Sequence, residues 1–422
     1  MIFLNKGLTY GLLTAITLMP WNATAVNSYF PRNATAINSY SKFLHTPKLD
    51  TLTNLAENLL VKSLLEITQG KNQQALTTID ELIHKIPNFK LAYLVRGDLL
   101  TAQAQRLQTF GNGITDTKQS EAVRDLQAEA RARIERYLSN EDLSKLPNLL
   151  LSPNEQQGHI IVVDTDKSRM YLYKNNAGSL SYVRDYYVTV GKNGIDKQVE
   201  GDKRTPIGVY FASQKLTRPL DDIYGDAAYP LNYPNEWDIL HNRTGSGIWL
   251  HGTSRTTYSR PPNASDGCVV LTNQDLNTLA PILQSGKTPV IIAKNLKWLP
   301  AGNSASASEK QALQESIDNW LNDWKSQNTP QYLSHYSPAF SSNGINYQKW
   351  AAHKYSVQAR KPKVDIALSN ISMFSYPDIG KKLVVVDFTQ DFKSPNLNNT
   401  MQKRQYWVQE GNTWKIIYEG AS

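Results

Sequence analysis

The sequence predicts a multidomain protein built from an N-terminal α-helical region, a mainly β domain and a C-terminal α+β domain. Three observations support this division. The chain has 422 residues, more than one hydrophobic core usually accommodates. Apolar residues recur at helical spacing before residue 146, whereas short β-rich runs separated by turn residues follow from His159. A small-residue linker at 299–308 then precedes another helix and a last set of strands.

Residues 1–25 have the pattern of a signal peptide. A weakly basic start is followed by a mostly apolar stretch and by the small-residue pattern Ala23-Thr24-Ala25. The apolar stretch is short for a membrane span, so we expect cleavage after Ala25 and export, with an uncleaved anchor as the alternative. Residues 26–50 are expected to form a flexible leader.

The charge balance is basic, with a formal net charge of +8 and a pI near 9.2. Such a balance favours acidic partners in general. However, the sequence contains no run of five Lys or Arg residues, and the positive charge is spread along the chain. Together with the expected export, this pattern argues against nucleic-acid binding.

Residues 51–146 are expected to be helical. Apolar residues of the first helix lie three or four positions apart, namely Leu55, Leu59, Leu60, Leu64 and Ile67. A second helix ends at Pro87, and a third begins near Leu91. The spacing of Gly70, Ala75, Pro87 and Ala92 resembles one tetratricopeptide repeat, and a plain helical bundle is the alternative. A protein partner could bind through this region, and residues 147–158 are expected to form a linker.

Residues 159–298 are expected to form the mainly β domain. Runs rich in β-branched and aromatic residues occur at 160–164, 170–173, 186–190, 208–211, 248–250 and 290–292. Beyond the linker at 299–308, residues 309–422 are predicted to begin with an amphipathic helix carrying Trp320 and Trp324 on one face. Strands are expected near 364–368, 383–388, 406–408 and 414–418. The aromatic residues of this last domain suit a core, a pocket or the face of a homodimer.

The chemistry of the chain is concentrated around its single cysteine. Cys268 follows His251 by 17 residues, and a glycine lies beside each of them. A thiol needs a neighbouring base to act as a nucleophile near neutral pH, and histidine is suited to that role. A strand ending at His251 and another beginning at Cys268 would bring the two side chains together if the strands are neighbours. On composition alone, a small buried apolar cysteine remains the alternative.

Other candidate residues are less specific. Tyr233 and Trp249 could line a substrate cleft, although core positions are commoner for aromatic residues. His159 and His241 are alternative bases, and structural roles are the commoner reading for both. The histidines show no metal-ligand spacing, so no metal site is predicted.

The segments His251-Gly252-Thr253 and Ser265-Asp266-Gly267-Cys268 resemble the catalytic motif of the L,D-transpeptidase (YkuD-type) family. Upstream, the segment 200–208 (EGDKRTPIG) is similar to the family pattern GD..TP.G. The resemblance covers about residues 159–296. It implies that Cys268 is the nucleophile and His251 the general base, with the Gly252 carbonyl orienting the imidazole. It also places Gly267, Ser265 and Asp266 at the oxyanion and substrate-binding positions.

The implied reaction acts on peptidoglycan tetrapeptide stems in the periplasm or cell envelope of a bacterium. A Cys thioester forms with release of D-Ala, and no metal or organic cofactor is needed. An amine acceptor would make the protein a transpeptidase, which is the leading expectation. A water acceptor would make it an L,D-carboxypeptidase that trims tetrapeptides to tripeptides, and a non-catalytic wall-binding scaffold is the third reading.

Two positions depart from the family motif. Asp266 stands where the family has a histidine, and Val270 where it has Asn or Arg. The Ser-Asp-Gly-Cys variant resembles a subgroup that pairs the catalytic domain with a C-terminal domain like nuclear transport factor 2. That subgroup includes L,D-carboxypeptidases with a role in cell shape, and the predicted C-terminal α+β domain fits such a partner.

Overall fold

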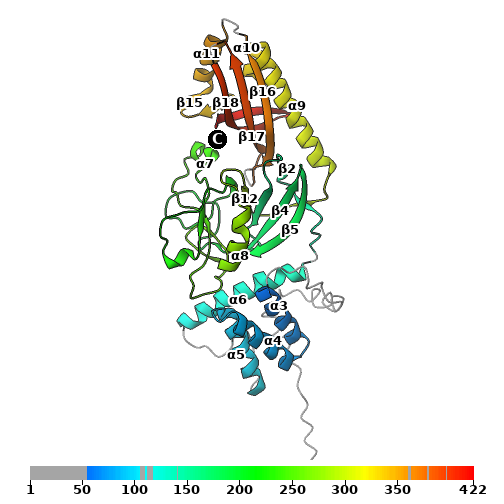
Figure 1. The fold of residues 1–422 in the computed structure, drawn as a ribbon, viewed down its shortest axis with the longest axis vertical. Coiled ribbons are helices and arrows are strands. Elements are labelled where there is room, and N and C mark those ends of the chain that lie inside the picture. The colour runs from blue at the N-terminus through cyan, green and yellow to red at the C-terminus, as the bar shows by residue number, and fades with distance from the viewer. Residues whose placement is uncertain are drawn as a thin grey trace, which may run out of the picture.

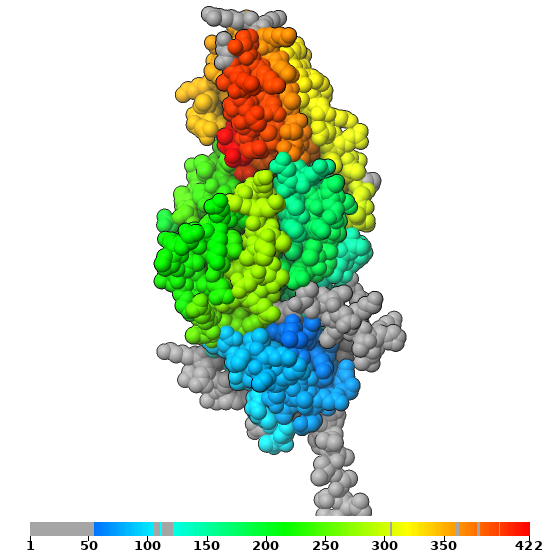
Figure 2. Space-filling model, in the orientation of Figure 1, coloured from blue at the N-terminus to red at the C-terminus, as the bar shows by residue number. Residues whose placement is uncertain are grey.

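A computed structural model describes residues 55–104, 110–111, 117–139, 141–359, 363–377, 380–395 and 397–422. The expected signal peptide and leader lie outside these residues. The three parts of the chain follow one another along the long axis of the molecule (Figures 1 and 2). The helical region lies at one end, the β-rich domain in the middle and the C-terminal α+β domain at the other end.

The described residues of the helical region form four helices: α3 (Leu55–Thr68), α4 (Asn72–Lys85), α5 (Lys90–Ala104) and α6 (Thr117–Leu138). Their apolar stripes pack into one core, in which Leu60, Ile79 and Leu82 are fully buried. The expected helical character is confirmed, and the tetratricopeptide resemblance stays a prediction. Tyr258, a residue of the middle domain, also belongs to this core.

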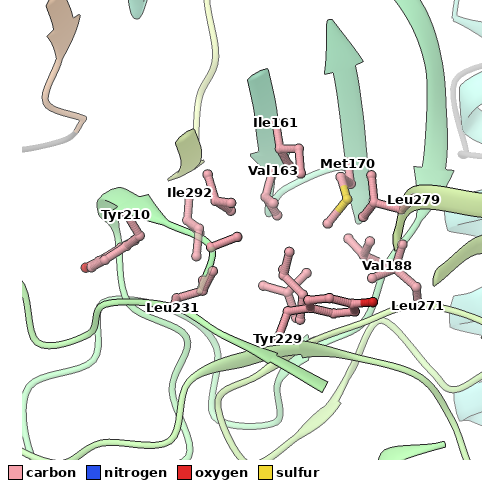
Figure 3. Close-up of a cluster of buried hydrophobic side chains, with 14 of the residues drawn as sticks. Ile161, Val163, Met170, Val188, Tyr210, Tyr229, Leu231, Leu271, Leu279 and Ile292 are labelled. Carbon is pink, nitrogen blue, oxygen red and sulfur yellow. The ribbon is translucent and has the colours of Figure 1, made fainter. Parts of the chain in front are cut away.

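The middle domain is built on a five-stranded sheet in the order β5-β4-β3-β12-β7. Its strands are β3 (His159–Asp164), β4 (Arg169–Asn176), β5 (Ser179–Tyr187), β7 (Gly208–Phe211) and β12 (Pro289–Ala293). The continuous apolar run of β3 is explained by burial of both faces. Ile161 and Val163 face one hydrophobic cluster, drawn in Figure 3, whereas Ile160 and Val162 face another.

Short strands and helices complete the middle domain around this sheet. They are β6 (Val190–Gly191), β8 (Ala228–Pro230), β9 (Trp249–His251), β10 (Asn263–Ser265), β11 (Val269–Val270), α7 (Glu236–Leu240) and α8 (Asn273–Leu279). A second sheet has the order β11-β9-β8, and β10 pairs with β6. Leu250 and Val269 from this second sheet pack into the cluster that contains Ile161, so the large sheet supports the strands that carry His251 and Cys268.

The C-terminal domain consists of a curved antiparallel sheet covered by helices, as expected. Its elements are α9 (Ser304–Ser326), α10 (Thr329–Ser334), β14 (Ser341–Ser342), β15 (Ile345–Asn346), α11 (Tyr347–Gln358), β16 (Asp365–Ser375), β17 (Leu383–Ser394), β18 (Leu397–Glu410) and β19 (Thr413–Ala421). Trp320 of α9, Trp407 and Trp414 are buried in one cluster between helix and sheet. These tryptophans therefore form a core, and a homodimer through this domain stays a prediction.

The two expected linkers contain regular structure. Residues 147–158 include the end of β1 (Leu146–Pro147) and all of β2 (Leu150–Ser152), and β2 adds a fifth strand to the C-terminal sheet beside β16. β1 pairs with β13 (Trp298–Leu299), and α9 begins at Ser304, inside the expected second linker. The sequence did not reveal these strands because each is too short to show alternation and pairs with a distant segment.

Among the described residues, no helix combines the length and apolar character that crossing a membrane would require.

Candidate active site

The two candidate catalytic residues lie on neighbouring strands. His251 is the last residue of β9, and Cys268 directly precedes β11. The strands run parallel, with Leu250 opposite Val269 and His251 opposite Val270. The expected strand adjacency is therefore confirmed.

The imidazole of His251 is oriented by the backbone. Its Nδ1 lies 2.7 Å from the carbonyl oxygen of Gly252, as the family resemblance implied. Because a carbonyl can only accept, Nδ1 must carry the proton, and Nε2 is left as the basic nitrogen. The side chain is 2% exposed. Burial, with a smaller contribution from the charge of Arg260, lowers the pKa of His251 to about 4, so the ring is neutral at neutral pH.

Cys268 is held as a protonated thiol in the resting structure. The residue is 8% exposed, and its Sγ donates to the carbonyl oxygen of Gly247 over 3.3 Å. Burial raises the pKa of the thiol to about 11, although the Arg260 charge partly offsets this effect. A neutral thiol and a neutral imidazole on adjacent strands indicate activation by proton transfer to the base, in place of a preformed thiolate–imidazolium pair.

The turn before Cys268 is fixed by side-chain hydrogen bonds. Gly267 has φ +124°, a conformation that favours glycine, and an added Cβ would lie 2.8 Å from the Arg204 carbonyl oxygen. The Ser265 hydroxyl donates to the Cys268 carbonyl over 2.7 Å and accepts from the Gly267 N–H over 3.1 Å. To serve in an oxyanion hole, the Gly267 N–H would therefore have to leave Ser265.

Thr205, which the sequence analysis did not single out, links the upstream motif to this turn. Its hydroxyl donates to the Gly267 carbonyl over 2.9 Å and accepts from the Gly191 N–H over 2.8 Å. Its place within the segment 200–208 was the only available signal. The TP part of that motif thus supports the backbone beside the nucleophile.

Asp266 and Val270, the two departures from the family motif, occupy different environments. The Asp266 side chain is 74% exposed and lies 2.8 Å from the Nζ of Lys192, which lowers the pKa of the carboxyl. Val270 is buried, and its backbone bonds with Thr189. Asp266 raises the pKa of the Cys268 thiol, but its effect is smaller than that of burial.

The two remaining candidates, Trp249 and Tyr233, occupy different places: the first lies near His251 and the second in the hydrophobic core. Trp249 is half-buried, with its ring 4.9 Å from Tyr224, whose ring lies 5.2 Å from that of His251. Tyr224 was missed because it ends a 3-10 helix of only three residues (Asp222–Tyr224), which is too short to show a periodic pattern. Tyr233 instead belongs to the hydrophobic core, and its hydroxyl donates to the Thr244 carbonyl. The alternative core reading therefore fits Tyr233 better than a role in the cleft.

Neither alternative base lies on the strands that carry the pair. His241 follows α7 and packs on Trp237 at 4.1 Å, while His159 begins β3. Within the part of the chain that the structure describes, no three His, Cys, Asp or Glu side chains are grouped so that they could hold a metal ion.

A basic pocket of about 470 Å³ adjoins the segment after His251. It is lined by Lys215, Leu216, Thr217, Arg218, Leu220, Gly225, Asp226 and Arg255. Its position is fixed by the backbone, because the Gly252 N–H donates to the Tyr224 carbonyl beside Gly225 over 3.0 Å. Three cationic side chains against one carboxylate favour anionic groups of a ligand.

Comparisons with known proteins agree with this geometry. The L,D-transpeptidase catalytic domain family (YkuD) matches residues 158–292, and the Cds6 C-terminal NTF2-like domain family matches residues 312–420. No curated protein matches the sequence significantly.

Two solved structures are similar to about two thirds of this chain. Bd1075 from Bdellovibrio bacteriovorus is 27% identical with a TM-score of 0.56, and the match covers 66% of this chain and 99% of that one. The helical cell shape determining protein Pgp2 from Campylobacter jejuni is 25% identical with a TM-score of 0.57, covering 65% of this chain and 95% of that one. The middle part of the chain is thus an L,D-transpeptidase (YkuD) catalytic domain, and the C-terminal part is an NTF2-like domain of the Cds6 type.

Proposed function

We propose that the protein is an exported enzyme that modifies peptidoglycan through a thioester on Cys268. The observation that carries this proposal is the neutral Cys268–His251 pair on adjacent parallel strands of an L,D-transpeptidase catalytic domain. The substrate is a tetrapeptide stem, cleaved before its terminal D-Ala. The basic pocket that adjoins the segment after His251 supports a substrate that carries carboxylates.

The first half of the reaction forms the thioester. Nε2 of His251 takes the proton from Sγ while the sulfur attacks the carbonyl carbon of the third stem residue. The N–H groups of Gly267 and Cys268 are the donors proposed for the resulting oxyanion. The imidazolium then returns its proton to the leaving amine, and D-Ala departs.

The second half transfers the acyl group to an acceptor. His251 takes a proton from an amine or a water, which attacks the thioester carbonyl and releases the Cys268 thiolate to be reprotonated. An amine on a second stem gives a cross-link and is the leading proposal. The second candidate is hydrolysis, which the burial of Cys268 favours because water needs a smaller opening than a second stem. The likeness to Pgp2, which is described as determining helical cell shape, supports a role in cell shape.

Product analysis of purified stems tests the proposal. Wild type is expected to convert tetrapeptides, whereas Cys268→Ala is expected to leave them intact because no thioester can form. Mass spectrometry would show cross-links between two third-position residues for a transpeptidase and unlinked tripeptides for a carboxypeptidase. Equal products from wild type and a folded Cys268→Ala would contradict thiol catalysis and favour the wall-binding scaffold.

The pH profile of kcat/KM should reflect the buried base. Because only neutral His251 can accept the proton, activity is lost as the pH falls through the pKa of the free enzyme's imidazole. Burial lowers this pKa to about 4, so the acidic limb is expected near pH 4, not near the ordinary value for histidine. Rates measured from about pH 3 to about pH 9, with the folded state checked at the acidic end, would show where this limb lies.

Arg260→Gln is the matched variant for this profile. The Arg260 charge helps to lower the pKa of His251, so its removal is expected to move the acidic limb to higher pH. An acidic limb centred near pH 6.5 in wild type would contradict a buried, neutral base.

A further inference from the structure

The segment that joins His251 to Cys268 leaves the catalytic domain and packs against the helical region. Tyr258, near its middle, is 6% exposed, and its ring centroid lies 4.7 Å from that of Phe89 before α5. The Tyr258 N–H donates to the Asn88 carbonyl over 3.1 Å, and the Asn88 side chain donates to the Arg255 carbonyl over 3.0 Å. The next residue, Ser259, donates from its hydroxyl to the Glu129 carboxylate on α6. The helical region thus holds this segment by a ring contact and three hydrogen bonds.

The same segment leads back to the catalytic base. The Thr253 hydroxyl donates to the Thr257 carbonyl over 3.1 Å, which closes the turn before Tyr258. The Asn273 side chain clamps the Thr253 backbone, accepting from its N–H over 3.1 Å and donating to its carbonyl over 2.9 Å. Gly252 fits closely here, since an added Cβ would lie 2.0 Å from the Asn273 Oδ1. The Gly252 carbonyl, which orients His251, therefore belongs to a segment that the helices hold at Tyr258.

The far end of the segment is held through the same helix. The Tyr187 hydroxyl donates to the Arg260 carbonyl over 2.9 Å, and the Thr189 hydroxyl donates to the Pro261 carbonyl over 2.8 Å. The ring of Tyr187 lies 4.0 Å from the guanidinium of Arg133 on α6. Arg133 therefore contacts Tyr187 at the end of β5, and Tyr187 in turn holds the chain that leads from Arg260 to Cys268.

Buried ion pairs fix the helices to the catalytic sheet. Arg133 pairs with Glu57 of α3 over 3.1 Å and with Glu129 over 2.9 Å. Glu57 also accepts from Arg169 of β4 over 2.8 Å, so one carboxylate links both domains. All four side chains are at most 4% exposed, which distinguishes this contact from a flexible tether.

From these contacts we infer that the helical region α3–α6 contributes to catalysis by positioning the base. Phe89 and Tyr258 are the positioning residues that hold His251 in its reactive orientation. The inference rests on the function proposed above for its kinetic consequences, but the positioning itself can be measured without substrate. Neither matched family includes residues 55–139, so this role belongs to the part of the chain that the comparisons leave unassigned.

The test uses Phe89→Ala in the full chain. Removal of the ring leaves a cavity beneath Tyr258, so the segment from Gly252 is expected to loosen and admit water around His251. A displacement of this kind is expected to lower kcat by about tenfold while KM changes little. The pKa of His251, followed by NMR of histidine-labelled protein, is expected to rise by about one unit as the ring becomes solvated.

Ile67→Ala is the matched control, because it creates a cavity in the same helical core within α3. It is expected to lower the melting temperature as much as Phe89→Ala and to leave kcat and the His251 pKa unchanged. Phe89→Leu, which keeps an apolar side chain beneath Tyr258, should restore most of the activity.

If Phe89→Ala does not fold, Asn88→Ala replaces it, since it removes only a half-buried side chain that bonds to the Arg255 carbonyl. A twofold to threefold loss in kcat, about 0.5 kcal/mol, is expected there. A His251 pKa that is unchanged in the folded variants, or that shifts equally in Ile67→Ala, overturns the positioning role. Because this readout needs no peptidoglycan, it separates failure of the inference from failure of the proposed enzymatic function.

Discussion

His251→Gln is expected to lower kcat/KM for tetrapeptide cleavage by about a thousandfold. The reason is the buried thiol of Cys268, whose pKa is raised to about 11. At about pH 7.5, only about 0.03% of such a thiol would be ionised without help. Glutamine has no group that can take the proton, so the variant must rely on this small fraction. Initial rates of release of the terminal amino acid, measured at saturating and limiting substrate, would check the expectation.

The residual activity of His251→Gln should also have a distinct pH dependence. If it depends on spontaneous ionisation of Cys268, its rate should rise about tenfold per pH unit up to the pKa of the thiol. His241→Gln is the matched control, because His241 packs on Trp237 outside the pair and its replacement should change the rate by less than about twofold. A His251→Gln enzyme that keeps a tenth or more of the wild-type rate would mean that another group removes the proton.

Much of the catalytic core could be predicted from the sequence because its signals are local. The run at 160–163 is apolar at every position, and this pattern predicts the strand that is buried on both faces. The adjacency of His251 and Cys268 followed from a general preference of consecutive strands to be neighbours. The motif glycines were also informative, since Gly252 and Gly267 lie where a side chain would collide with Asn273 or with the backbone.

The contacts between domains could not be predicted in this way. β2 has three residues and pairs with β16, more than 200 positions along the chain, so no periodicity marks it. Tyr258 lies in an irregular segment, and nothing in its local sequence indicates burial in a helical core. Arg133 and Glu57 are 76 residues apart and look like ordinary surface charges of amphipathic helices. Such pairings appear only when both partners are placed in three dimensions.

The departures at Asp266 and Val270 show how the structure changes the meaning of a motif difference. Charge alone suggested that an anion beside the thiol would hinder its ionisation. The structure places the Asp266 carboxylate outside, against Lys192, so that a neighbouring cation compensates much of its charge. Burial of the sulfur, which no motif encodes, is the larger influence on the thiol.

Arg133→Ala is expected to cause the largest loss of stability, lowering the free energy of unfolding of the helical region by about 3–5 kcal/mol. The guanidinium is fully buried between Glu57 and Glu129, and its removal leaves two buried carboxylates without this counter-charge. Burial raises the pKa of Glu129, which depends mainly on Arg133 for its counter-charge. Burial also tends to raise the pKa of Glu57, but Arg169 and Arg133 together hold it below its usual value. Glu129 is therefore the group whose charge becomes most costly. Urea unfolding followed by the circular dichroism of the helices would measure the loss.

Arg96→Ala provides the control within the same helices. Arg96 forms an ion pair with Asp80 at 2.6 Å, but both side chains are more than 40% exposed, so the loss should stay below about 1 kcal/mol. The double variant Arg133→Met/Glu129→Leu should recover part of the stability, because an apolar pair of similar volume leaves fewer charges without partners. If Arg133→Ala and Arg96→Ala cost the same, the buried cluster does not fix the helices to the catalytic sheet. The double variant also removes the hydrogen bond between Ser259 and Glu129. If it is stable but its kcat is as low as that of Phe89→Ala, this contact helps to position the segment between His251 and Cys268, independently of stability.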